Sequence, residues 1–138
     1  MVFSSFFTTI AFIKYNIFPM NRTELLKELR IYGTIHEVPN ITDVNAHFLC
    51  DLIQVSKTTD MLEIGTANGY SAICFWDVLE QQWGRLTSIE FSAPSHGLAQ
   101  TNVARAGLSD TIQLVLWNAL DEIPKQLDDG FDFIFIDG

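Results

Sequence analysis

The sequence is poor in positive charge. Only eight of its 138 residues are lysine or arginine, against seventeen aspartates and glutamates, so the formal net charge is −9. The basic residues are scattered, whereas a surface that follows nucleic acid or an anionic membrane needs them clustered. We therefore expect no DNA and no membrane partner, and the same acidity argues against RNA.

Cysteine is also scarce, with only Cys50 and Cys74 present. Both stand inside apolar helical patterns, where a cysteine packs as a small hydrophobic side chain. We predict buried, reduced thiols rather than a disulfide or a metal site. This cysteine usage is typical of a cytoplasmic protein.

The first nineteen residues are apolar and aromatic, yet they predict neither a targeting signal nor a membrane span. The first basic residue, Lys14, comes late in the apolar stretch instead of ahead of it, and no small-residue cleavage site follows. Polar residues interrupt the stretch, whereas a membrane helix needs about 20 predominantly apolar residues. We interpret residues 1–19 as an extension, or as a product of an incorrect gene model, ahead of a single domain over residues 20–138.

Residues 61–71 organise the rest of the chain. Here an apolar run breaks into a glycine-spaced loop and then resumes as a helical pattern. The run predicts a buried strand of a parallel sheet, followed by a tight turn and a helix start. Gly65 and Gly69 permit positive φ or a close approach of a ligand to the backbone. Loops of this kind lie at the carboxyl ends of parallel strands, where open α/β sheets bind their ligands.

The loop lacks the residues that would hold a phosphate. A dinucleotide motif counted from Gly65 needs glycine at position 67 and glycine or alanine at position 70, but the chain has Ala67 and Tyr70. The lysine of a phosphate loop is missing as well. Glu90, which ends the next apolar run, can accept hydrogen bonds from both hydroxyls of a ribose. These features favour a nucleoside-like ligand without a phosphate and point to S-adenosylmethionine.

Four segments, read together, carry a family resemblance: LEIGTANGYS (62–71), SIE (88–90), AGL (106–108) and FDFIFIDG (131–138). In this order and spacing they resemble the class I S-adenosylmethionine-dependent O-methyltransferases related to catechol and caffeoyl-coenzyme A methyltransferases. The resemblance implies a doubly wound, Rossmann-like α/β fold with a parallel sheet and flanking helices. It also implies methyl transfer to a hydroxyl oxygen of a small molecule. The family's sheet order is 3-2-1-4-5-7-6, so we interpret this chain as a fragment that lacks the last three strands.

The resemblance places cofactor-binding residues around the predicted loops. Ser71 would meet the carboxylate of the cofactor, with a plain N-cap role as the alternative, and Ile41 and Thr42 would either contact its methionine part or only begin a helix. Asn118 stands where the family commonly has aspartate, and Trp117, in place of glycine, could stack beside the adenine. The predicted cofactor-binding set is Ile41, Thr42, Glu63, Gly65, Thr66, Ala67, Gly69, Tyr70, Ser71, Glu90, Asn118, Ala119 and Asp137.

Asp137 is also the predicted metal ligand. In the metal-dependent members of the family a divalent cation, usually Mg²⁺, binds the substrate hydroxyls and lowers their pKa, and the aspartate that ends the fourth strand is a ligand. The partner ligands and the lysine expected three residues later would lie beyond Gly138, so no catalytic residue is assigned. A turn-capping role is the alternative for Asp137, as structural roles are for Glu63 and Glu90.

The periodicity predicts a specific order of elements. A short helix over 24–30 with Thr23 as its cap precedes a loop at Gly33 and Pro39. The second helix starts at Thr42 or Asp43, and its predicted core face is Val44, Phe48, Leu49, Leu52 and Ile53. Further strands are predicted at 61–64, 85–90, 111–116 and 131–136, and further helices at 70–83, 94–107 and 120–127, with His96 on the solvated surface.

Two rival functions remain open. The first is methylation of RNA, because some relatives of this family modify tRNA. The second is an inactive cofactor-binding module that pairs its exposed last strand with another chain, since an uncovered apolar edge invites association. A homodimer is a further expectation, and the identity of the hydroxylated substrate does not follow from the sequence.

Overall fold

The computed structural model describes residues 20–121 and 130–137. The predicted extension over residues 1–19 therefore lies outside the described residues, as does most of the helix predicted over 120–127. Within the described part no helix is long and apolar enough to cross a membrane.

The core of the fold is a parallel sheet of four strands in the order β3-β2-β1-β4. These are β1 (Asp60–Ile64), β2 (Arg85–Glu90), β3 (Ile112–Leu116) and β4 (Phe133–Ile136). The predicted doubly wound fold is confirmed, and all four predicted strands exist within one or two residues of their expected bounds. The chain steps outward from β1 to β3 and then returns to place β4 on the other side of β1. This reversal makes the gap between β1 and β4 the switch point at which such sheets bind ligands.

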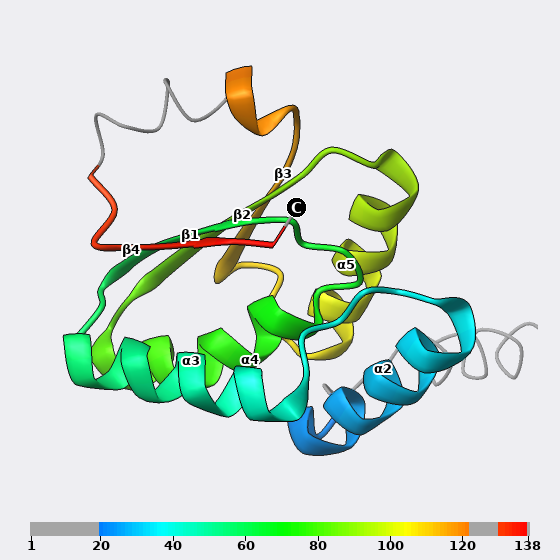
Figure 1. Cartoon of the computed structure of the whole chain (residues 1–138), viewed down its shortest axis with the longest axis horizontal. Helices are drawn as coiled ribbons and strands as arrows, with labels where there is room; N and C mark the ends of the chain where they lie inside the picture. The colour runs from blue at the N-terminus through cyan, green and yellow to red at the C-terminus, as the bar shows by residue number, and fades with distance from the viewer. Residues whose placement is uncertain (1–19, 122–129, 138) are drawn as a thin grey trace, which may run out of the picture.

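Within the described residues, four complete helices flank the sheet (Figure 1). They are α2 (Arg22–His36), α3 (Asp43–Ser56), α4 (Tyr70–Leu79), which continues as a 3-10 turn over Glu80–Gln82, and α5 (Ala93–Arg105). The crossovers through α4 and α5 step in the same direction, and because such crossovers are right-handed, both helices cover the same face. The short turn at residues 119–121 lies on the opposite side of the sheet (Figure 1).

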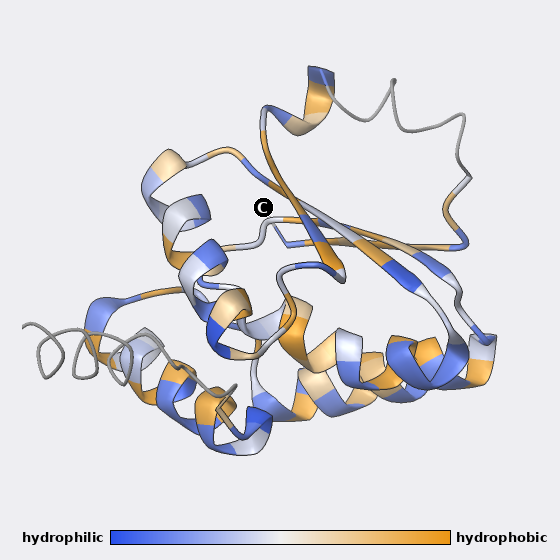
Figure 2. Ribbon diagram, turned by 180° about the vertical axis from the view of Figure 1, so that it is seen from behind, coloured by the Kyte–Doolittle hydropathy of each residue, from blue (hydrophilic) through white to orange (hydrophobic). Residues whose placement is uncertain are grey.

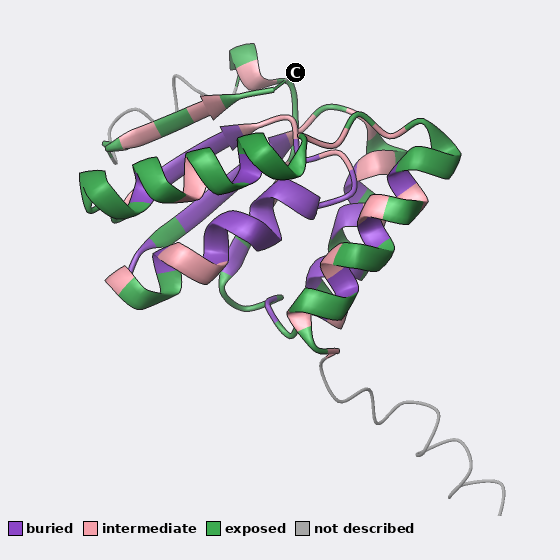
Figure 3. Cartoon of the chain, turned by 60° about the horizontal axis from the view of Figure 1, so that its bottom comes forward, coloured by how far each residue is buried: buried purple, intermediate pink, exposed green. Residues whose placement is uncertain are grey.

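The most deeply buried helix is α4, which lies beside α3 in the layer that covers the sheet (Figure 3). Eight of its ten residues are buried. Phe75 is fully buried and meets the ring of Phe135 from β4 edge to face, with the ring centroids 5.4 Å apart. This packing fixes α4, and with it the glycine loop that precedes the helix, relative to β1 and β4.

The first described helix differs from its prediction at both ends. Asn21, not Thr23, is the cap, and its side-chain oxygen accepts hydrogen bonds from the amides of Thr23 and Glu24. The helix also continues through Gly33 to His36. A side chain at position 33 would collide with Asn40, whose Nδ2 donates to the carbonyl oxygen of Leu29. Gly33 is therefore a site of close packing inside the helix and does not begin the loop.

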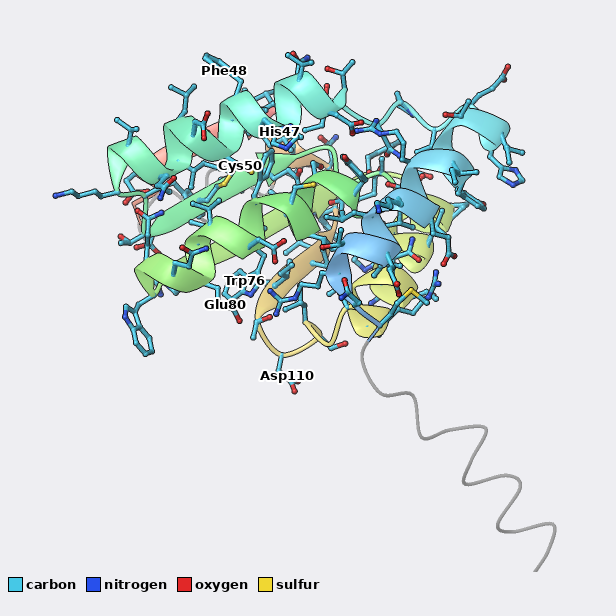
Figure 4. The ribbon with its side chains drawn as sticks, turned by 90° about the horizontal axis from the view of Figure 1, so that it is seen from below. His47, Phe48, Cys50, Trp76, Glu80 and Asp110 are labelled. Atoms are coloured by element: carbon cyan, nitrogen blue, oxygen red, sulfur yellow. The ribbon has the colours of Figure 1, made fainter. Side chains whose placement is uncertain are left out.

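The predicted core face of α3 is partly wrong. Val44, Phe48 and Leu52 are exposed, and Figure 4 shows Phe48 pointing away from α4. Ala46 and Ile53 are buried, and Leu49 and Cys50 pack against the core. Apolar residues therefore occur on both the exposed and the packed face of this helix. Apolar and polar residues alternate along the helices that cover the sheet (Figure 2), so the periodicity did not distinguish the faces.

His96 is buried, which contradicts its predicted place on the solvated surface. It lies on the same face of α5 as Ala99 and Val103, three and seven residues later, and this face packs inward. Both cysteines are free thiols; Cys74 is buried as predicted, whereas Cys50 is only half-buried. Cys50 lies between α3 and α4 (Figure 4), with its Sγ 3.6 Å from the carbonyl oxygen of Cys74.

Candidate functional site

The loop after β1 turns sharply through three residues with positive φ. Gly65, Ala67 and Gly69 have φ values of 98°, 49° and 85°. The amide of Gly65 donates to the carbonyl oxygen of Ile89, 2.9 Å away, and this bond continues the pairing of β1 with β2 beyond the strand. Gly69 then caps α4 without a side-chain hydrogen bond. The loop is therefore held close to the sheet while its backbone remains next to the cleft described below.

A cleft of about 610 Å³ opens at the carboxyl ends of the strands. It brings together six of the predicted site residues: Gly65, Ala67, Glu90, Asn118, Ala119 and Asp137. These residues come from the ends of all four strands, which the parallel register places along one edge. The same cleft is lined by eight other residues, Glu37, Val38, Pro39, Ile64, Ile89, Phe91, Ser95 and Trp117.

Glu90 is oriented by two backbone amides. Its Oε2 accepts a hydrogen bond from the amide of Ala67, 2.9 Å away, and its Oε1 accepts one from the amide of Ser92, 2.7 Å away. A carboxylate has about four acceptor positions, so each oxygen keeps one for a ligand. The structure thus holds a carboxylate in a fixed direction at the end of β2.

Glu63 occupies a different environment beneath the loop. It is fully buried, and its two carboxylate oxygens accept hydrogen bonds of 2.5 Å from the hydroxyls of Ser71 and Ser88. Burial is the main cause that raises its pKa to about 7, with smaller contributions from the negative charges of Asp137 and Glu90. The serine hydroxyls act in the other direction, because they stabilise the ionised form. Glu63 does not line the cleft, so any effect it has on a ligand passes through its neighbours.

Several predicted site residues have their side chains engaged elsewhere. The hydroxyl of Tyr70 donates to Asp43, 2.9 Å away, and the guanidinium of Arg30 lies 4.2 Å from the centroid of the Tyr70 ring. The side chain of Thr42 caps α3 by accepting from the amide of Asn45, which is the alternative role considered for it. Ile41 packs against the core.

The remaining loop residues are also outside the cleft. The hydroxyl of Thr66 is buried 2.6 Å from that of Ser88, and Ser71 donates to Glu63. A Cβ added at Gly69 would lie 3.5 Å from the backbone of Ala99, so this glycine packs against α5. These residues shape and support the loop.

The sequence predicted one of the two aromatic side chains that line the cleft and missed the other. Trp117 was predicted to lie beside the adenine. Phe91 was not predicted, although it directly follows Glu90 and is largely exposed. The segment Glu37 to Pro39 was also missed. Its approach to the strand ends depends on the length of α2, which the periodicity underestimated, and Glu37 itself ends that helix in a left-handed conformation.

The described residues do not complete a Mg²⁺ site. Asp137 is exposed at the end of β4 and lines the cleft, but no group of three histidine, cysteine, aspartate or glutamate side chains within residues 20–121 and 130–137 could hold a metal ion. Mg²⁺ needs near-octahedral oxygen coordination, and a single carboxylate supplies one or two of these positions. The assignment of Asp137 to a metal stays a prediction.

A second cavity, of about 390 Å³, lies at the opposite edge of the sheet. It is lined by residues at the amino ends of the strands, including Asp60, Arg85 and Asp110. Asp60 and Arg85 already form an ion pair with each other. Ligands of open α/β sheets bind at the carboxyl ends, so we assign the functional site to the cleft that contains the glycine loop.

The fold and the cleft define a class: doubly wound α/β proteins that bind a nucleoside-containing ligand at a glycine-spaced loop opposite a fixed carboxylate. Within this class the chain belongs to the O-methyltransferase family, whose model matches residues 18–138.

Individual relatives agree with this membership. The catechol O-methyltransferase of Niastella koreensis is 38% identical over 93 residues, which cover 65% of this chain and 42% of that protein. Among solved structures, the O-methyltransferase from Bacillus cereus in complex with SAH matches with a TM-score of 0.73 and 28% identity over 93% of this chain and 59% of that one. TomG from Streptomyces achromogenes, in complex with SAM, matches with a TM-score of 0.73 and 28% identity over 83% and 53%. The chain thus spans about half the length of the proteins it matches.

Proposed function

We propose that the protein binds S-adenosylmethionine in the cleft at the carboxyl ends of the strands and serves methyl transfer to a hydroxyl oxygen of a small molecule. The observation that carries the proposal is the carboxylate of Glu90, fixed by two backbone amides beside the glycine loop. A carboxylate so placed suits the two hydroxyls of a ribose, and the loop offers no lysine for a phosphate.

The rest of the cleft suits the nucleoside. Phe91 and Trp117 are largely exposed aromatic side chains on its wall and offer flat surfaces to an adenine ring. Asn118 lies next to Trp117, and its carbonyl oxygen is an acceptor for the exocyclic amino group of adenine. Gly65 and Ala67 bring the backbone of the loop to the same cleft.

The amino-acid end of the cofactor would lie toward the start of α4. The first turn of a helix has amides without partners inside the helix, and the helix dipole favours an anion there. Ser71 is in this turn and supplies a hydroxyl. We propose that Glu63 acts behind Ser71 and that Thr66, Gly69 and Tyr70 support the loop, while Ile41 and Thr42 place α3 beside it.

The chemistry requires alignment more than acid–base catalysis. When bound, S-adenosylmethionine supplies the methyl group, and the protein must hold the acceptor oxygen in line with it and exclude water. Alignment alone supplies about 7–11 kcal/mol of the barrier in favourable cases. In this proposal the cleft residues hold S-adenosylmethionine, the methyl donor. The methyl acceptor is a small hydroxylated compound, since the relative named above is a catechol O-methyltransferase.

The proposal is tested by titrating the protein with S-adenosylhomocysteine in a calorimeter. We expect saturable binding to one site, and Glu90→Gln should weaken it about tenfold, because a hydrogen bond to a charged group contributes about 1.5–3 kcal/mol. Asp110→Asn is the matched control, since it neutralises a carboxylate at the opposite edge of the sheet (Figure 4). Absence of binding to the folded protein, or equal effects of the two substitutions, would overturn the proposal.

A further inference from the structure

Four buried or nearly buried side chains form one continuous hydrogen-bonded chain beneath the glycine loop. It runs from Thr66 in the loop through Ser88 on β2 and Glu63 on β1 to Ser71 in the first turn of α4. The successive oxygen-to-oxygen distances are 2.6, 2.5 and 2.5 Å. The chain therefore connects the loop, both central strands and the start of α4 through exchangeable protons.

We propose that Glu63 is a proton-linked positioning residue, whose protonation turns Ser71 into a hydrogen-bond donor for the carboxylate of an amino-acid-bearing ligand. The inference rests on the proposed function, because it assumes that such a ligand binds beside the first turn of α4. In this arrangement a proton on a buried side chain is coupled to the binding of one end of the ligand.

The coupling follows from the number of hydrogen-bond donors in the chain of side chains. An ionised carboxylate accepts hydrogen bonds and donates none. While Glu63 is ionised, Ser71 and Ser88 each direct their single hydroxyl hydrogen to it, and Thr66 can donate to Ser88. In this state Ser71 offers an incoming carboxylate only oxygen lone pairs, which repel it.

Protonation reverses one hydrogen bond without breaking the chain. The new O–H on the Glu63 oxygen next to Ser71 donates to the serine oxygen, while Ser88 continues to donate to the other Glu63 oxygen. The hydrogen of Ser71 is then free to turn toward the first turn of α4. Ser71 is the partly accessible end of the chain, being 7% exposed against 0% for Glu63 and Ser88. The released donor thus emerges where the helix already favours an anion.

The surrounding charges favour the protonated form. The charged groups that act on Glu63 are Asp137 at the end of β4 and Glu90 at the end of β2, and both are negative. Its contacts on α4 and β2 are neutral hydroxyls. Burial together with these charges raises the pKa of Glu63 to about 7, so the switch operates near neutral pH.

The test compares two ligands at pH 6 and pH 8. S-adenosylhomocysteine carries the amino-acid carboxylate, whereas 5′-methylthioadenosine has the same nucleoside without it. For the unaltered protein we expect the affinity for S-adenosylhomocysteine to fall about tenfold from pH 6 to pH 8, as a hydrogen bond to a charged group is lost. The affinity for 5′-methylthioadenosine should not change.

Two substitutions make the test specific. Glu63→Gln places an N–H donor permanently in the chain, so the variant should bind S-adenosylhomocysteine at both pH values as the unaltered protein does at pH 6. Ser71→Ala should weaken the binding of S-adenosylhomocysteine at pH 6 and make that binding independent of pH. The affinity for 5′-methylthioadenosine should not change. If Glu63→Gln fails to fold, proton uptake by the unaltered protein on binding S-adenosylhomocysteine at pH 7.5, measured in two buffers of different ionisation enthalpy, replaces it.

Three results would overturn the inference, and a fourth would overturn the proposed function on which it rests. If Glu63 instead contacted the ammonium group of the ligand directly, affinity would rise from pH 6 to pH 8 and Glu63→Gln would weaken binding at both. If the affinities for both ligands changed equally with pH, the pH effect would lie in the nucleoside site. If 5′-methylthioadenosine and S-adenosylhomocysteine both failed to bind at any pH, the proposed function itself would be wrong, whereas pH-independent binding of both would defeat the inference alone.

Discussion

The backbone amide of Ala67 donates a hydrogen bond to the carboxylate of Glu90 across 2.9 Å. Ala67 belongs to the loop after β1, and Glu90 ends β2, so the bond joins the two adjacent strand ends that line the cleft. Ala67 reaches this position in a left-handed conformation, with φ of 49°. The direction of the Glu90 carboxylate therefore depends on the conformation of Ala67 as well as on the amide of Ser92.

Ala67→Val tests this dependence. A β-branched side chain is strongly disfavoured at positive φ, so we expect the free energy of unfolding to fall by roughly 1–2 kcal/mol and binding of S-adenosylhomocysteine to weaken. Ala67→Gly is the control, because glycine adopts this conformation without steric strain, and it should retain binding. Urea unfolding and calorimetry measure the two effects. Normal binding by the valine variant would show that the loop conformation does not position Glu90.

Two glycines make a matched pair for the turn before α4. Gly69 has φ of 85°, whereas Gly97 is an ordinary helical residue of α5 with no atom within 4 Å of an added Cβ. We expect Gly69→Ala to lower the free energy of unfolding by about 1–2 kcal/mol, since an L-residue is strained there. Gly97→Ala should raise it by about 0.5–1 kcal/mol, because alanine is the better helix former. Equal effects in urea unfolding would contradict the assigned backbone conformations.

Glu63 should make stability depend on pH in an unusual direction. Its pKa is about 7 in the folded protein against 4.5 for a free side chain, so its contribution is fully present below pH 4.5 and is lost as the pH rises through 7. Glu28, Asp43 and Glu80 have lowered pKa values, and their contributions are lost only in acid, below this window.

The measurement is urea unfolding of the unaltered protein and Glu63→Gln at pH 5.5 and pH 8. We expect the unaltered protein to lose roughly 2 kcal/mol of stability between pH 5.5 and pH 8, and the glutamine variant to lose much less. A parallel pH dependence in the two proteins would show that Glu63 does not titrate near neutrality.

The sequence predicted the sheet well for a physical reason. Each strand is a short apolar run bounded by turn residues, and β2 was located at its observed bounds, Arg85–Glu90. Strand order followed from the family resemblance. Helix limits and faces were harder, as α2 and α3 show. The length of α2 depends on the packing of Asn40 against Gly33, and the face of α3 depends on which apolar stripe meets α4. Neither contact is local in sequence.

The free edge of β4 makes a further prediction about association. Among the described residues β4 pairs only with β1, and its Ile134 and Ile136 are 51% and 68% exposed. Exposed apolar edges associate, so we expect the protein to self-associate and Ile134→Lys to reduce this. Ile31→Lys is the control, because Ile31 is 61% exposed on α2, away from the sheet edge. Sedimentation velocity distinguishes the two; equal effects would exclude the edge as the site of association.

The sequence predicted those site residues whose place in the cleft depends only on the position of the backbone. Gly65, Ala67, Glu90 and Asp137 line the cleft because strand ends in a parallel sheet share one edge. Glu63, by contrast, was expected to bind the cofactor but is buried under the loop. Its role depends on the partners that Ser71 and Ser88 provide, and the sequence does not show which hydroxyls meet which carboxylate.

Binding of the nucleoside of S-adenosylmethionine in the cleft beside Glu90 can be observed residue by residue. The measurement is a series of amide nuclear magnetic resonance spectra of ¹⁵N-labelled protein during titration with S-adenosylhomocysteine. We expect saturable shifts at Gly65, Ala67, Glu90 and Asn118, with the amides of the opposite cavity around Asp110 unchanged. Shifts confined to that opposite cavity, or none at saturating ligand, would contradict binding in this cleft.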